Sequence, residues 1–85
     1  MKIFEHQIKD PSGLHARPAG MLVKEASSFS SEITIEANDK KADAKKIFSL
    51  MSLNIRYGQT ITVSVSGSDE ELAANSLKKF LENNI

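Results

Sequence analysis

Apolar and polar residues alternate along three stretches of the chain, as they do in strands with one buried face. These stretches are residues 2–8, 32–37 and 60–66. Their inward positions are Phe4, His6, Ile8, Ile33, Ile35, Ile61, Val63 and Val65. A polar stretch, residues 40–44, follows the turn pair Asn38-Asp39 and predicts a short edge strand.

Three other segments carry apolar residues at helical spacing. In the first, Ala19, Leu22, Val23 and Ala26 fall on one face and predict a helix over residues 16–27, with Phe29 closing over its end. The last helix opens at the capping-box sequence of residues 68–71. Its core stripe is Ala73, Leu77 and Phe80, flanked by Leu81. A short helix is predicted over residues 46–53, and Asn54 suits the left-handed conformation after it.

The resulting order of elements is βαββαβα in a single domain spanning residues 1–85. Strands with one apolar face each need helices to cover that face, which predicts an α+β open-faced sandwich. Alternation, rather than continuous apolar runs, favours an antiparallel sheet whose other face meets water. We therefore expect a four-stranded antiparallel sheet covered on one face by three helices.

The middle helix carries two apolar stripes. Leu50 and Leu53 point toward the sheet, and Ile47, Phe48 and Met51 form a second stripe roughly 100° or more away. One sheet covers only one stripe, so the second predicts a docking surface for a partner. The alternative is that a loop or the first helix covers it, and helix geometry alone does not choose between the two.

Residues 12–19, Ser-Gly-Leu-His-Ala-Arg-Pro-Ala, place a histidine where the first helix begins. Pro18 belongs in a first helical turn, where its missing N–H costs nothing. His15 therefore lies at or just before the helix N-terminus. Unpaired amides at such an end, here those of Ala16 and Arg17, attract anions.

These groups form a candidate phosphate site. The guanidinium of Arg17 suits phosphate oxygens, and the imidazole of His15 is a nucleophile. Together they are equipped to carry a phosphoryl group on histidine. The alternative is a polar cap or surface histidine with no chemical role.

Composition limits the other functions. The chain has 85 residues, no cysteine and a formal net charge of zero. Zero net charge argues against broad binding to nucleic acid or to an anionic membrane, and no apolar run predicts membrane insertion. The beginning of the chain lacks a signal-peptide pattern, and the absence of cysteine fits a reducing cytoplasm. His6 is interpreted as a packed or edge histidine, and we expect no metal site.

Two segments carry a resemblance to a known family. Residues 13–19, Gly-Leu-His-Ala-Arg-Pro-Ala, match the active-centre motif of the HPr phosphocarrier proteins of the bacterial phosphoenolpyruvate-dependent sugar phosphotransferase system. Residues 45–53, Lys-Lys-Ile-Phe-Ser-Leu-Met-Ser-Leu, resemble the segment around that family's regulatory site. The similarity extends over essentially the whole chain.

The resemblance implies a phosphocarrier rather than an enzyme with its own turnover. His15 would accept a phosphoryl group on Nδ1 from phosphorylated enzyme I and pass it to the IIA components of sugar permeases. Arg17 and the helix amides, including that of Ala16, would stabilise the phosphoryl group, with Ser12 helping to orient the ring. The implied partner-docking residues are Gly20, Lys24, Ile47, Phe48 and Met51. The expected protein is a cytoplasmic monomer without a cofactor.

One position departs from the family pattern. Many Gram-positive members have a serine, phosphorylated by a dedicated kinase, where this chain has Lys46. Lysine cannot accept that phosphate, so no regulatory serine is expected at the matching position. Together with Lys40, Lys41 and Lys45, Lys46 is interpreted as part of a solvated edge.

Three other functions are weighed against the general carrier. One is a carrier for a nitrogen-regulatory or single-sugar branch. Another is a non-catalytic interaction module, in which His15 is incidental. The third is a small enzyme with His15 as general base, which the lack of a carboxylate in the motif to orient the ring and the lack of room for a pocket disfavour.

Overall fold

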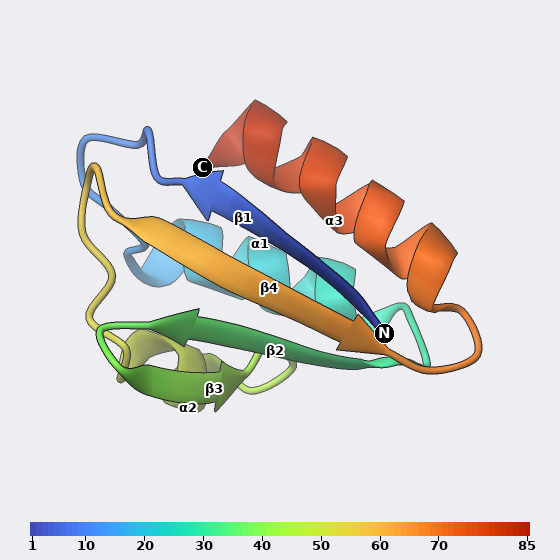
Figure 1. Ribbon diagram of the computed structural model, residues 1–85. Coiled ribbons are helices and arrows are strands. Elements are labelled where there is room, and N and C mark those ends of the chain that lie inside the picture. The colour runs from blue at the N-terminus through green and yellow to red at the C-terminus, as the bar shows by residue number, and fades with distance from the viewer.

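The computed structural model describes residues 1–85 and confirms the predicted order of elements (Figure 1). Each predicted element is present, with small differences at the ends: the middle helix is shorter than residues 46–53, and the strands predicted over residues 2–8 and 40–44 each end one residue earlier. The elements are β1 (Lys2–Gln7), α1 (Ala16–Ser27), β2 (Glu32–Ala37), β3 (Lys40–Asp43), α2 (Ile47–Met51), β4 (Thr60–Ser66) and α3 (Glu70–Asn84).

The four strands form one antiparallel sheet in the order β1-β4-β2-β3. Val63 of β4 pairs with Phe4 of β1 on one side and with Ile35 of β2 on the other. Alternate residues point to opposite faces, so this row of apolar side chains faces the helices. The first strand of the chain, β1, thus lies beside the last, β4.

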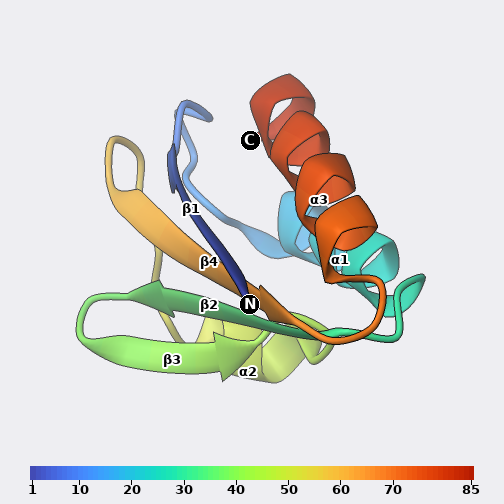
Figure 2. The ribbon, with the colours of Figure 1, turned by 45° about the vertical axis from the view of Figure 1, so that its right-hand side comes forward.

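All three helices lie on one face of the sheet (Figure 2). The core between the two layers contains 21 buried apolar residues, among them Ile8, Leu22, Ile35, Val63 and Leu77. On the other face β4 presents the half-buried side chains of Thr62 and Ser64 to solvent. This confirms the predicted open-faced sandwich. No helix has the length and the apolar composition needed to cross a membrane.

Left-handed backbone conformations occur where the turn residues predict them. Asn38 (φ 53°) and Asp39 (φ 63°) form the tight turn between β2 and β3. Asn54 (φ 54°) confirms the predicted left-handed residue after α2. The side-chain amide of Asn38 also donates to the carbonyl of Leu53 at 2.9 Å. The hairpin turn is therefore tied to the end of the middle helix.

The predicted capping box at α3 is wrong in its details. Asp69 is the N-cap residue but its side chain caps nothing on its own helix. Its carboxylate instead accepts hydrogen bonds from the amides of Ser30 and Ser31 and from the Ser31 hydroxyl. These bonds, that of the Ser31 hydroxyl first, lower the pKa of Asp69 to about 2. The carboxylate is used across the fold because the amides of Ser30 and Ser31, just before β2, lie next to it and donate to no other acceptor.

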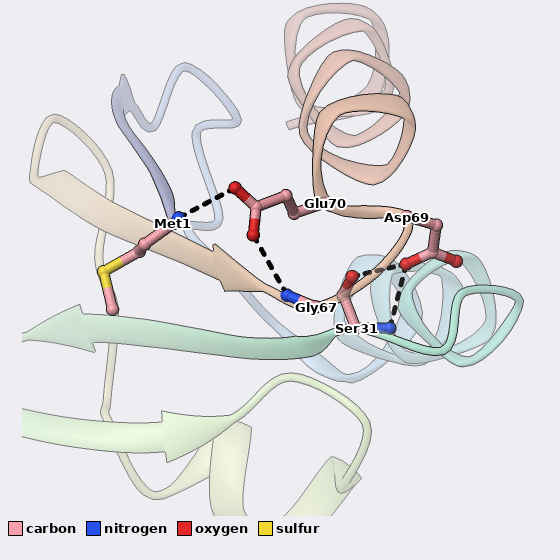
Figure 3. A network of polar contacts seen from close by, with 5 residues as sticks. All are labelled: Met1, Ser31, Gly67, Asp69 and Glu70. Atoms are coloured by element: carbon pink, nitrogen blue, oxygen red, sulfur yellow. Dashed lines mark hydrogen bonds and ion pairs between the residues drawn. The ribbon is translucent and has the colours of Figure 1, made fainter.

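The neighbouring Glu70 joins two further segments (Figure 3). One carboxylate oxygen lies 2.7 Å from the Met1 amino group, and the other accepts from the Gly67 amide at 3.2 Å. Both contacts favour the charged form, so the pKa of Glu70 is lowered, chiefly by the bond from the amino group. The start of α3 thus holds the beginning of β1 and the end of β4.

Lys45 does not belong to a solvated edge. Its ammonium donates a hydrogen bond to the carbonyl of Phe29 at 2.7 Å, and the side chain is half-buried. Phe29 itself packs against the core at the end of α1, as predicted. Lysine serves here because its long stem reaches from the segment before α2 to a backbone carbonyl just beyond the end of α1.

Candidate functional site

His15 occupies the N-cap position of α1. The loop that follows β1 leads into the start of this helix (Figure 1). The backbone of His15 is extended, and its side chain makes no capping hydrogen bond. The first helical hydrogen bond runs from the Ala19 amide to the His15 carbonyl at 3.0 Å. The amides of Ala16 and Arg17 precede that bond, and Pro18 has none. Two backbone donors therefore remain available beside an exposed imidazole.

The loop that carries His15 rests on the segment after α2. Gly13 has φ +67°, and a Cβ there would lie 2.7 Å from the carbonyl oxygen of Ile55. The Leu14 amide donates to that same oxygen at 3.1 Å, and the Leu14 side chain is buried. Glycine is required because both its conformation and the close approach exclude a side chain. Buried Leu14 and Pro18 on either side leave His15 facing outward.

The motif itself has no carboxylate, but one from outside it, that of Asp10, lies beside the His15 ring. Oδ2 of Asp10 is 3.6 Å from Nε2 of His15, and Oδ1 accepts a hydrogen bond from the Ser12 amide at 2.9 Å. Asp10 stands five residues before His15, where the sequence indicated only a loop. The turn at residues 10–13 folds the chain back and brings the two side chains together. Ser12, which the resemblance implies would help to orient the ring, donates its amide to Asp10, and its hydroxyl has no hydrogen-bond partner.

His15 and Arg17 line a shallow depression of about 220 Å³. Its other lining residues are Asp10, Pro18, Met21 and Asn84. Asn84 is the last residue of α3. The end of this helix is held at the site because the amides of Lys9 and Asp10 both donate to the Ile85 carbonyl, at 2.7 and 2.9 Å. No spacing in the sequence relates Asn84 to His15, so only the fold reveals it.

The middle helix separates its two stripes largely as predicted. Leu50 and Leu53 are buried, whereas the Phe48 side chain is 86% exposed and Met51 is 36% exposed. Ile47 departs from the prediction because it is half-buried and packs against the core. The reason is geometric: Ile47 lies one turn before Leu50 and therefore near the same face. The exposed apolar surface is thus formed by Phe48 and Met51.

On α1, Gly20 and Lys24 are both exposed, as docking requires. Met21 lies between them and is also exposed, at 40%. The helical periodicity of α1 placed Met21 outside the core stripe, but sequence reasoning assigned it no role. Flexible methionine side chains suit surfaces that meet several partners, so Met21 extends the set of candidate docking residues.

His6 is packed rather than exposed to a ligand. It is half-buried on the helix-facing side of β1, and its Nε2 has no hydrogen-bond partner. Burial, with a smaller contribution from the charge of Lys9, lowers the pKa of His6 and favours the neutral ring. No group of three His, Cys, Asp or Glu side chains is placed to hold a metal ion.

Comparison with known proteins gives a consistent result. The family model described as "PTS HPr component phosphorylation site" matches residues 3–83. A phosphocarrier protein HPr of Buchnera aphidicola is 48% identical over 81 residues, covering 93% of this chain and 95% of the relative. Two Thermoanaerobacter tengcongensis structures, of HPr and of an HPr dimer, are each 43% identical to this chain. The match to the HPr structure has a TM-score of 0.93 and covers 99% of this chain and 94% of that one. The match to the HPr dimer has a TM-score of 0.77 and covers 98% of this chain and 95% of that one.

These matches span nearly the full length of both this chain and its relatives. The chain therefore belongs to the HPr family, the phosphocarrier proteins of the phosphotransferase system.

Proposed function

We propose that this member of the HPr family carries the phosphoryl group on Nδ1 of His15. The observation that carries the proposal is the position of His15 as the N-cap of α1, with its ring exposed and uncommitted to a capping bond. A phosphoryl group on the ring would lie beside the free amides of Ala16 and Arg17. Helix N-terminal amides and an arginine side chain both stabilise phosphate oxygens.

The transfer needs no proton to leave the attacking nitrogen. The Nδ1 lone pair forms the new bond to phosphorus, and the bond between phosphorus and the donor breaks, with its electron pair staying on the donor. The amides of Ala16 and Arg17 and the guanidinium of Arg17 offset the charge on the phosphoryl oxygens. Onward transfer repeats the same displacement in the opposite direction, with an acceptor replacing the donor.

A shared active site follows from the shape of this region. The depression beside His15 is shallow, and the ring is 44% exposed, so the chain alone does not exclude water from the reaction. A partner must complete the environment of the transferring group. Enzyme I would do so as donor and a IIA component as acceptor, each docking on Gly20, Lys24, Phe48 and Met51, with the partly covered Ile47 at the edge.

The protein would act as a monomer in the cytoplasm, where phosphoenolpyruvate is produced. A monomer leaves the exposed residues of α1 and α2 free for successive partners. The HPr dimer among the similar structures makes the oligomeric state a point to measure, and sedimentation at the concentration of the transfer assay would do so. A dimer whose interface covers Phe48 would contradict this docking surface.

The test is a transfer assay with enzyme I and phosphoenolpyruvate. We expect one acid-labile phosphoryl group per chain, located on His15 by mass spectrometry and on Nδ1 by ³¹P NMR. His15→Ala should abolish labelling while leaving thermal unfolding nearly unchanged, because residue 15 is exposed. His6→Ala is the matched control, since His6 is the other histidine of the chain and should leave labelling intact. Labelling of His15→Ala at another residue would refute the assignment, and no labelling of the native chain would favour an interaction module.

A further inference from the structure

Three hydrogen bonds hold Asp10 in place beside His15. Its amide donates to the Ile85 carbonyl at 2.9 Å, and its own carbonyl accepts from the Gly13 amide at 2.9 Å. In the side chain, Oδ1 accepts from the Ser12 amide at 2.9 Å. Oδ2 is thereby left to face Nε2 of His15 at 3.6 Å. Two bonds thus fix the backbone of Asp10, and the Ser12 amide orients its carboxylate.

We propose that Asp10 is a positioning residue for phosphoryl transfer, which acts by keeping the proton of His15 on Nε2. This inference rests on the proposed function of His15. A negative oxygen facing Nε2 favours the tautomer with its hydrogen on that nitrogen, and the lone pair is then on Nδ1. A carboxylate that holds a histidine in the correct tautomer is a known device of nucleophilic catalysis.

The charge of Asp10 has a second consequence during transfer. When Nδ1 bonds to phosphorus while Nε2 keeps its proton, the ring becomes an imidazolium and carries a positive charge. Asp10 stabilises that charge from the side opposite the phosphoryl group. The phosphoryl oxygens, in turn, would lie toward the free amides of Ala16 and Arg17 at the start of α1. Nε2 thus has a negative group beside it, which favours attack through Nδ1.

The size of the effect follows from exposure. The side chains of Asp10 and His15 are 26% and 44% exposed, and exposed ion pairs contribute about 0.2–1 kcal/mol. That free energy corresponds to a change of up to about fivefold in a rate or in a tautomer ratio. The effect is modest because water competes for both groups.

Asp10→Asn removes the charge but keeps an oxygen that can accept from the Ser12 amide. We expect this variant to accept phosphate about two- to fivefold more slowly. Two donors should be used: phosphorylated enzyme I, and phosphoramidate as a small donor that requires no docking. In alkaline buffer, the ¹⁵N signals of His15 should show the Nδ1–H tautomer increased by a similar factor. Asp10→Glu keeps the charge and should retain part of both the rate and the tautomer preference.

Asp43→Asn provides a matched control. Asp43 makes the same local bond, accepting from the Lys45 amide at 2.9 Å, but it lies in β3 at the opposite edge of the sheet from β1. It should leave the rate and the His15 tautomer unchanged. A slower Asp10→Asn variant with an unchanged tautomer ratio would mean that Asp10 only shapes the loop, and would overturn the proposal. Equal rates and equal tautomer ratios would overturn it as well.

The tautomer measurement separates this inference from the proposed function. If enzyme I does not phosphorylate the native chain, the function fails, yet the ¹⁵N signals still report whether Asp10 orients the ring. If the native chain is phosphorylated on His15 and Asp10→Asn behaves identically, only the role of Asp10 fails.

Discussion

The carboxylate of Asp69 accepts hydrogen bonds from both the amide and the hydroxyl of Ser31, 38 residues earlier in the chain. Ser31 is almost fully buried just before β2, whereas Asp69 directly precedes α3. The contact closes the end of the sandwich opposite the His15 loop, where the α1–β2 and β4–α3 connections meet (Figure 3). It also makes a measurable link between stability and pH.

Asp69→Asn should destabilise the domain at neutral pH but not in strong acid. The folded pKa of Asp69 is lowered from 3.8 to about 2. A lowered carboxyl pKa contributes stability above the unfolded value, and this contribution is lost as pH falls from 3.8 through about 2. Thermal unfolding from neutral pH to pH 2 should therefore show the two proteins converging. Glu71→Gln, which removes an exposed carboxylate from the same helical turn, is the control and should give curves parallel to the native protein.

Three glycine-to-alanine substitutions separate backbone strain from steric clash. Gly13→Ala should be the most destabilising, since it combines a positive φ with a Cβ 2.7 Å from a carbonyl oxygen. Gly58→Ala has φ +85° but open space, and should cost about 1–2 kcal/mol from the left-handed conformation alone. Gly20→Ala, in the interior of α1 with nothing within 4 Å, should instead stabilise by about 0.5–1 kcal/mol. Urea unfolding measures all three, and an equal cost at Gly13 and Gly58 would show that the loop yields to the added methyl group.

Phe48→Ala and Leu50→Ala should have opposite effects on binding and stability. Phe48 is 86% exposed, so its loss should change the free energy of unfolding by within about 0.5 kcal/mol. Leu50 is 1% exposed, and its truncation should cost about 2–5 kcal/mol. Calorimetric titration with enzyme I should show weaker binding for Phe48→Ala than for the native chain. A native affinity in that variant would remove Phe48 from the docking surface.

Lys46→Ser should create a kinase substrate. Lys46 is the exposed N-cap residue of α2, with an extended backbone (φ −125°, ψ 114°) and no side-chain capping bond. A serine there fits the N-cap position and presents a hydroxyl where many Gram-positive relatives have one. An HPr kinase with ATP should label the variant but not the native chain, as read by mass spectrometry. Label on native Ser49 or Ser52 would show that the chain has a regulatory site elsewhere.

Local sequence determined much of this protein. Alternation placed Ile61, Val63 and Val65 on the buried face of β4, and Pro18 marked the first turn of α1. Both follow from short-range rules: side-chain direction repeats every second residue in a strand, and proline fits only where no backbone N–H has to donate a hydrogen bond. The same rules placed His15 at the start of the helix. They were less reliable for Ile47, because two stripes on a helix of five residues are hardly separated.

Tertiary structure alone decided which polar groups meet. Asp10 beside His15, Lys45 on the carbonyl of Phe29 and Asn84 at the edge of the site have no signature in spacing. Apolar periodicity records which face of an element is buried, but a polar side chain is selected by the one donor or acceptor that packing brings within reach. That partner is set by how the elements pack together, so the surroundings of His15 became visible only when the end of α3 was placed against the loop after β1.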